Sequence, residues 1–95
     1  MLEAKVKVIN QLGLHARAAA QLVKMASKFK SRINLTREDN SVIADAKSIL
    51  SVLTLAAAKG TEIKLEVTGD DEKKALQSTV ELFATGFGEL RDKNL

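Results

Sequence analysis

The segment Gly13-Leu14-His15-Ala16-Arg17 holds the side chains best suited to chemistry in this chain of 95 residues. His15 is the sole histidine, and it falls where a loop becomes a helix. The start of a helix has unpaired backbone N–H groups and a partial positive charge, which together attract anions. A cation such as Arg17 in the first turn is repelled by the helix dipole, which lowers stability by about 0.3–1 kcal/mol. A bound anion beside it would make the interaction of Arg17 with this site favourable instead. The segment therefore predicts a pocket for a phosphoryl group.

In such a pocket the two side chains would have different roles. A neutral imidazole keeps a lone pair, so His15 could take the phosphoryl group as a nucleophile and pass it on. Arg17 and the helix amides would hold the phosphoryl oxygens in the transition state. The alternative is a surface histidine that only caps the helix, beside an ordinary solvated arginine. On spacing alone that alternative is the commoner one.

Ser48 is the second candidate, because it opens a helical stretch next to the apolar residues Ile49, Leu50 and Leu53. Serine is a common N-cap, and a cap is the usual explanation for a serine in this position. A phosphate on its hydroxyl would suit the helix end and would place about −1.5 to −2 charges beside the apolar cluster. If the cluster is exposed, it is a docking patch whose partners the phosphate changes. Otherwise the cluster is simply core.

The elements that position these residues alternate between two periodicities. Alternating apolar and polar residues predict strands, and apolar residues at helical spacing predict helices, in the order βαββαβα. Strands with one polar face imply an antiparallel sheet with helices on its other face. Asp70 or Asp71 is expected to cap the last helix. The expected strands contain Leu2–Val8, Ile33–Leu35, Val42–Ile43 and Ile63–Val67; the expected helices run from Ala16 to about Lys28, from Ser48 to Leu55, and along a buried stripe of Leu76, Val80, Phe83 and Phe87.

The first and fourth predicted strands are expected to be neighbours. Their polar sides carry Lys5 and Lys7 on one strand and Glu62 and Glu66 on the other, so the charges are complementary.

Composition excludes several classes of protein. The chain has no Cys and one His, which excludes disulfides, thiolate catalysis and clusters of Cys or His around a metal. A net charge of +3 and no Tyr or Trp argue against a nucleic-acid surface. No apolar run approaches the ~20 residues of a membrane span, and the N-terminus is not a signal peptide. We expect one cytoplasmic domain over residues 1–90, a frayed tail over 91–95, no cofactor and no metal.

With these motifs in place, the chain resembles the HPr family, the histidine-containing phosphocarrier of the bacterial phosphoenolpyruvate-dependent sugar phosphotransferase system. The segment from Gly13 to Arg17 resembles the active-site signature, and Ala46-Lys47-Ser48-Ile49-Leu50 resembles the regulatory serine segment. The resemblance runs from Leu2 to about Leu90. Two positions depart from the family pattern: Ala18 stands where the family often has Pro, and Ser51 where it often has Gly. The second departure leaves open which serine is modified.

The resemblance implies an α+β fold, an open-faced sandwich in which three helices cover one face of a four-stranded antiparallel sheet. It implies a carrier with no turnover of its own, which accepts phosphate on His15 from enzyme I and passes it to enzyme IIA domains. Arg17 would stabilise the phosphate, and Ser48 would be modified by HPr kinase/phosphorylase. A carrier that docks several partners is expected to be a monomer without membrane insertion. The resemblance places its docking surface on Ala20, Lys24, Ile49, Leu50 and Leu53.

Three alternatives remain open from the sequence. The chain could be the carrier of the nitrogen-related regulatory branch of this system. It could also be a regulatory module that uses Ser48 and the apolar patch without carrying phosphate, although an intact His15 and Arg17 argue against that. A small nucleic-acid-binding domain is the third alternative, and its affinity should weaken steeply with salt.

Overall fold

The alternating segments form a four-stranded antiparallel sheet in the computed structural model, which describes residues 1–89, with the strand order β1-β4-β2-β3. In β4, one of the two inner strands, Ile63, Leu65 and Val67 are fully buried, and the residues between them face away from the core. The predicted α+β fold and the order βαββαβα are confirmed. The strands are β1 (Leu2–Lys7), β2 (Arg32–Arg37), β3 (Ile43–Asp45) and β4 (Glu62–Thr68).

Strand β1 pairs with β4, as the sequence predicted, but charge does not set the register. Lys7 faces Glu62, whereas Lys5 faces Lys64. Like charges directly opposite one another weaken a strand pair. The pairing therefore depends on the apolar faces of the two strands rather than on cross-strand ion pairs.

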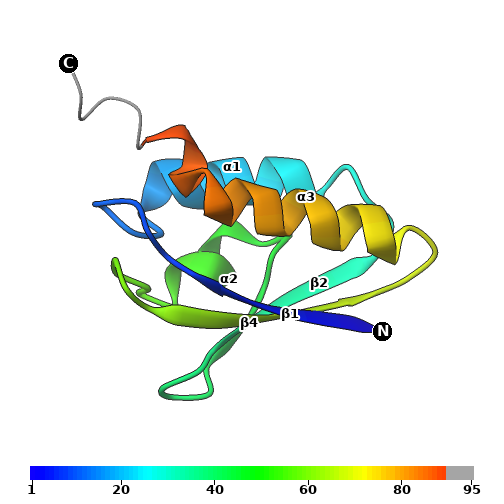
Figure 1. Cartoon of the computed structure of the whole chain (residues 1–95), viewed down its shortest axis with the longest axis horizontal. Coiled ribbons are helices and arrows are strands. Elements are labelled where there is room, and N and C mark those ends of the chain that lie inside the picture. The colour runs from blue at the N-terminus through cyan, green and yellow to red at the C-terminus, as the bar shows by residue number, and fades with distance from the viewer. Residues whose placement is uncertain (90–95) are drawn as a thin grey trace.

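Two long helices lie side by side over one face of the sheet and run in opposite directions (Figure 1). The buried side of the first, α1, consists of alanines and Leu22. It ends at Ala26, with Ser27 as its C-cap, which is two residues short of the predicted Lys28. The helices are α1 (Ala16–Ala26), α2 (Ile49–Leu53) and α3 (Glu72–Ala84), followed by the 3₁₀ turn η1 (Gly86–Gly88).

The last helix has Asp71 at its N-cap position, as predicted, but it ends earlier than predicted and the Asp71 side chain bonds elsewhere. Phe83 is buried as expected, but α3 stops at Ala84, so Phe87 belongs to η1. Asp71 stands at the N-cap position, but its side chain makes no capping hydrogen bond to the helix. Its carboxylate accepts hydrogen bonds from the backbone N–H groups of Lys30 and Ser31, at 2.9 Å each, and from the Ser31 hydroxyl. These bonds, that of the Ser31 hydroxyl above all, lower the pKa of Asp71 to about 2. The carboxylate thus ties the turn after α1 to the start of α3.

The described part of the chain has one core, between the sheet and the helices. No helix within residues 1–89 is long and apolar enough to cross a bilayer. The same residues contain no group of three or more metal-ligating side chains. The predicted frayed tail over residues 91–95 lies outside the described residues.

Candidate functional site

The loop before α1 is fixed by a glycine that no other residue could replace without strain. Gly13 has φ +67°, and a Cβ atom there would lie 2.4 Å from the carbonyl oxygen of Ala57. The next residue, Leu14, donates its N–H to that same oxygen at 2.9 Å. The close approach of the two backbones fixes the end of the loop. It therefore also fixes the position of His15 directly before α1.

His15 is the N-cap of α1. Its backbone is extended (φ −76°, ψ −178°), and its Nδ1 accepts a hydrogen bond from the Arg17 N–H at 3.3 Å. Only a nitrogen that has a lone pair can accept a hydrogen bond from an N–H group. In the neutral ring Nδ1 therefore has no proton, and the proton is on Nε2. The side chain is 28% exposed. Nδ1, the nitrogen with the lone pair, therefore faces the positive end of a helix, on a side chain that is partly exposed.

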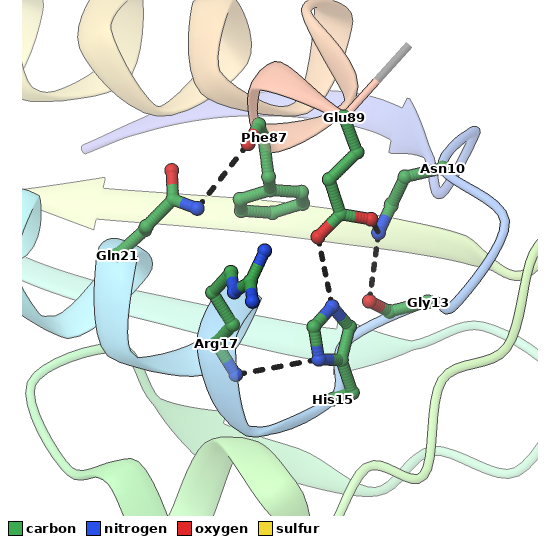
Figure 2. Close-up of polar contacts among 7 residues, drawn as sticks. All are labelled: Asn10, Gly13, His15, Arg17, Gln21, Phe87 and Glu89. Atoms are coloured by element: carbon green, nitrogen blue, oxygen red, sulfur yellow. Dashed lines mark hydrogen bonds and ion pairs between the residues drawn. The ribbon is translucent and has the colours of Figure 1, made fainter. Parts of the chain in front are cut away.

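A carboxylate far along the chain holds the other side of the ring. Nε2 of His15 lies 2.8 Å from Oε2 of Glu89, whose side chain is 18% exposed (Figure 2). Oε1 of Glu89 accepts a hydrogen bond from Nδ2 of Asn10 at 3.1 Å. Partial burial raises the pKa of Glu89, but the bonds from His15 and Asn10 and the charge of Arg17 lower it more, so its net pKa is below the ordinary value. Glu89 is therefore an anion at neutral pH.

Sequence reasoning missed Glu89 and Asn10. Glu89 follows His15 by 74 positions, and no local spacing connects them. The only hint was the pair Gly86 and Gly88, which interrupts the helical pattern and lets the chain turn back.

Arg17 is exposed in the first turn of α1, and its side chain points toward the segment that holds Phe87 and Glu89 (Figure 2). Within residues 1–89 its guanidinium makes no hydrogen bond or ion pair. It is close enough for its charge to lower the pKa of Glu89. The structure thus brings His15 and Arg17 together at one helix start, with the guanidinium donors of Arg17 available to an anion.

Ser48 is the N-cap of α2, and its Oγ accepts a hydrogen bond from the Ser51 N–H at 3.3 Å. Ser51 is engaged differently, because its own Oγ accepts from the Asp45 N–H at 2.9 Å. Of the two serines that the sequence left open, Ser51 fixes α2 to β3 and Ser48 occupies the helix start.

Comparison with known families decides what kind of protein carries this site. The family model described as the PTS HPr component phosphorylation site matches residues 2–85. This chain belongs to the HPr family. HPr proteins are phosphocarriers of the phosphotransferase system, and this membership agrees with a carrier rather than an enzyme.

Individual HPr proteins match the chain over nearly its full length. The phosphocarrier protein HPr of Xylella fastidiosa is 47% identical over 89 residues, which is 94% of this chain and 98% of that protein. The crystal structure of HPr-C-His from Thermoanaerobacter tengcongensis superposes with a TM-score of 0.87 at 40% identity, covering 94% of this chain and 98% of the other. An HPr dimer from the same organism superposes with a TM-score of 0.72 at 40% identity, covering 94% and 100%.

The apolar cluster that the sequence left as either core or surface is on the surface of this HPr. Ile49, Leu50 and Leu53 are 39%, 74% and 37% exposed, whereas Val52 and Leu55 of the same stretch are buried. The short helix α2 therefore has apolar side chains on its exposed side as well as on its buried side. Two further predicted docking residues, Ala20 and Lys24, are exposed on α1, the helix that lies against α2.

Proposed function

We propose that this HPr accepts a phosphoryl group on His15 from phosphorylated enzyme I and donates it to enzyme IIA domains of the sugar phosphotransferase system. The observation that carries the proposal is the orientation of the ring. Nδ1 keeps its lone pair toward the N–H groups at the start of α1, and Arg17 follows two positions later. A nucleophile, a positive helix end and an unpaired cation are what transfer of a phosphoryl group requires.

The step itself needs no cofactor. The Nδ1 lone pair attacks phosphorus, the bond from phosphorus to its donor atom breaks, and that atom leaves with the electron pair. The Arg17 N–H, at 3.3 Å from Nδ1, makes only a weak hydrogen bond, so little is lost when the phosphoryl group replaces it. The freed N–H and the guanidinium then face the phosphoryl oxygens, where they stabilise the spread negative charge.

Docking is assigned to the exposed faces of α1 and α2. Ile49, Leu50 and Leu53 would bury their apolar surface against enzyme I or an enzyme IIA domain, and Ala20 and Lys24 would extend that contact. Exposed apolar side chains gathered on one face are typical of protein interaction sites. We expect a cytoplasmic monomer, because the same face must meet each partner in turn.

Ser48 is proposed as the regulatory site, modified by HPr kinase/phosphorylase in a host that has this enzyme. Its hydroxyl borders the exposed cluster, and phosphate at a helix start is electrostatically favourable. Ser51 is the weaker candidate, since its hydroxyl is bonded to the backbone of β3. Modification would therefore change docking without unfolding α2.

The test is incubation with phosphoenolpyruvate and enzyme I, followed by intact-mass measurement. The wild type should gain one acid-labile phosphate, and His15→Ala should gain none. Ser48→Ala is the matched control, because it removes the other helix-capping candidate and should gain phosphate as the wild type does. A phosphate that persists in His15→Ala would refute the assignment.

The acceptor then separates the remaining alternatives. Transfer from the phosphorylated protein to a sugar-specific IIA domain supports the sugar branch, whereas transfer only to the IIA domain of the nitrogen-related branch supports that alternative. A chain that binds enzyme I but gains no phosphate would be the regulatory module without carrier function.

A further inference from the structure

The residues after α3 form a strap, residues 85–89, that returns to the start of α1 (Figure 2). Phe87 anchors the strap in the core, where its ring packs edge-to-face on Phe83 with centroids 5.1 Å apart. Gln21 of α1 donates from Nε2 to the Phe87 carbonyl oxygen at 3.2 Å. Phe87 also has φ +56°, a left-handed conformation that an aromatic residue rarely adopts. Strain of this kind persists only where the surroundings enforce it, commonly at functional sites.

Asn10 fastens the end of the strap. It is fully buried, and its Nδ2 donates both to the Gly13 carbonyl oxygen at 2.8 Å and to Oε1 of Glu89 at 3.1 Å. Rotating the amide would place its oxygen against two acceptors, so its orientation is fixed. As a result, Oδ1 has no partner in the part of the chain that the structure describes. A buried amide oxygen without a partner destabilises a fold, and its persistence suggests that holding Glu89 matters.

We propose that Glu89, held by the strap and by Asn10, is a positioning residue that keeps a proton on Nε2 of His15 throughout the phosphoryl cycle. The proposal rests on the function proposed above and adds a residue to the same site. Its basis is the 2.8 Å contact between Nε2 and the carboxylate, together with the cap bond on Nδ1. Nε2 thus keeps the proton, and Nδ1 is the nitrogen that bonds to phosphorus.

The consequence lies in the return step. Once Nδ1 is bonded to phosphorus, the ring with its Nε2 proton is a cation, and the Glu89 carboxylate lies beside it. When an acceptor attacks phosphorus, the Nδ1–P bond breaks and its electron pair returns to Nδ1, so a neutral ring leaves. If Nε2 had lost its proton, the ring would leave as an imidazolate anion, a far poorer leaving group. No proton needs to move during transfer in either direction.

The charged groups around the ring act in opposite directions. Arg17 and the start of α1 disfavour a cationic ring, whereas Glu89 from the strap favours it; Asn10, from the loop, is neutral. Glu89 is the only acid among the described residues that contacts the ring. Removing its charge should therefore matter most at high pH, where the proton on Nε2 is most easily lost.

The experiment compares Glu89→Gln with Glu81→Gln, the same change at an exposed position of α3. Donation of phosphate to a IIA domain is measured from pH 6 to pH 9, and the ring tautomer is read from ¹⁵N NMR. Glu89→Gln should slow donation about tenfold at pH 8 and much less at pH 6. Its ring should become a mixture of tautomers, because a glutamine amide can either accept from Nε2 or donate to it. Glu89→Asp, which keeps the charge, should recover part of the high-pH rate.

Gln21→Ala loosens the strap from outside the ring and should shift the pH profile in the same direction by a smaller amount. Thermal unfolding of each variant separates these effects from loss of fold. If the wild type gains no phosphate on His15, the proposed function fails. If the wild type is phosphorylated and Glu89→Gln matches Glu81→Gln in tautomer and pH profile, only the role of Glu89 fails.

Discussion

His15 and Ser48 occupy the same structural position at the starts of two different helices. Nδ1 of His15 accepts the Arg17 N–H, and Oγ of Ser48 accepts the Ser51 N–H, each at 3.3 Å. Neither helix has an acidic residue in its first turn. Each proposed phosphate acceptor is therefore a helix cap whose reactive atom already faces backbone N–H groups.

The surroundings of the two caps differ. Glu89 holds the far side of the His15 ring. His15 itself lies between a loop fixed by Gly13 and a helix of 11 residues. Ser48 begins a helix of only 5 residues beside exposed apolar side chains. A group that takes up and releases phosphate repeatedly needs its ring held in one geometry. A regulatory hydroxyl needs only to be reached by a kinase and to border the surface whose binding it changes.

The largest expected effect comes from a change in the loop that precedes His15, which has no counterpart at Ser48. Gly13→Ala would force a side chain into a left-handed backbone and to within 2.4 Å of the Ala57 carbonyl oxygen. We expect a loss of about 3 kcal/mol or more in the free energy of unfolding, measured by urea denaturation. The control is Gly60→Ala, also at positive φ but with no atom within 4 Å of the new Cβ, which should lose about 1–2 kcal/mol. Equal losses in the two variants would contradict the role given to the close approach.

The next effect concerns chemistry rather than stability. Arg17→Ala should slow phosphoryl transfer from enzyme I by about 100-fold, because it removes a cation from the charge that develops on phosphorus. The melting temperature should hardly change, since Arg17 is exposed and makes no ion pair within residues 1–89, and such an arginine adds little stability. Lys28→Ala, which removes an exposed cation beyond the other end of α1, is the control and should transfer at the wild-type rate. A large loss of stability in Arg17→Ala would mean that Arg17 supports the fold rather than the phosphate.

Local patterns in the sequence were enough to predict most of the fold and both helix caps. The alternation in β4, the helical spacing in α1, and the positions of His15 and Ser48 before apolar runs are all signals within a few residues. The polar faces of the strands predicted an antiparallel sheet with helices on its other face, and the resemblance to HPr implied the same arrangement as an open-faced sandwich. The register of β1 against β4 was not predictable from charge, because burial of the apolar faces decides it.

What the sequence could not predict are contacts between distant segments. The bond from His15 to Glu89 spans 74 positions and that from Asn10 to Glu89 spans 79. Asp71 looked like a helix cap, yet its carboxylate bonds to the turn 40 positions earlier. An acidic residue shortly after a glycine is common in any chain. Only the folded structure shows which of these acidic residues bond to a distant segment.

The smallest predicted effect tests the Ser48 side of the comparison. Ser48→Asp places a negative charge next to Leu50, which is 74% exposed, and a partner would have to desolvate that charge on docking. We expect affinity for enzyme I, measured by titration calorimetry at fixed salt, to fall about tenfold, or ~1.4 kcal/mol. Aspartate is itself a good N-cap, so stability should stay within about 0.5 kcal/mol of the wild type.

The matched control for that charge is Ser41→Asp in the exposed turn between β2 and β3. Ser41 has φ +60°, which aspartate tolerates better than most residues, so the control adds the same charge with little strain. It should leave the affinity for enzyme I unchanged, because it lies outside the proposed docking face. An equal loss in both variants would show that overall charge weakens docking, whereas no loss in Ser48→Asp would remove Ser48 from the docking surface. Either result would leave His15 as the one helix cap with a functional role.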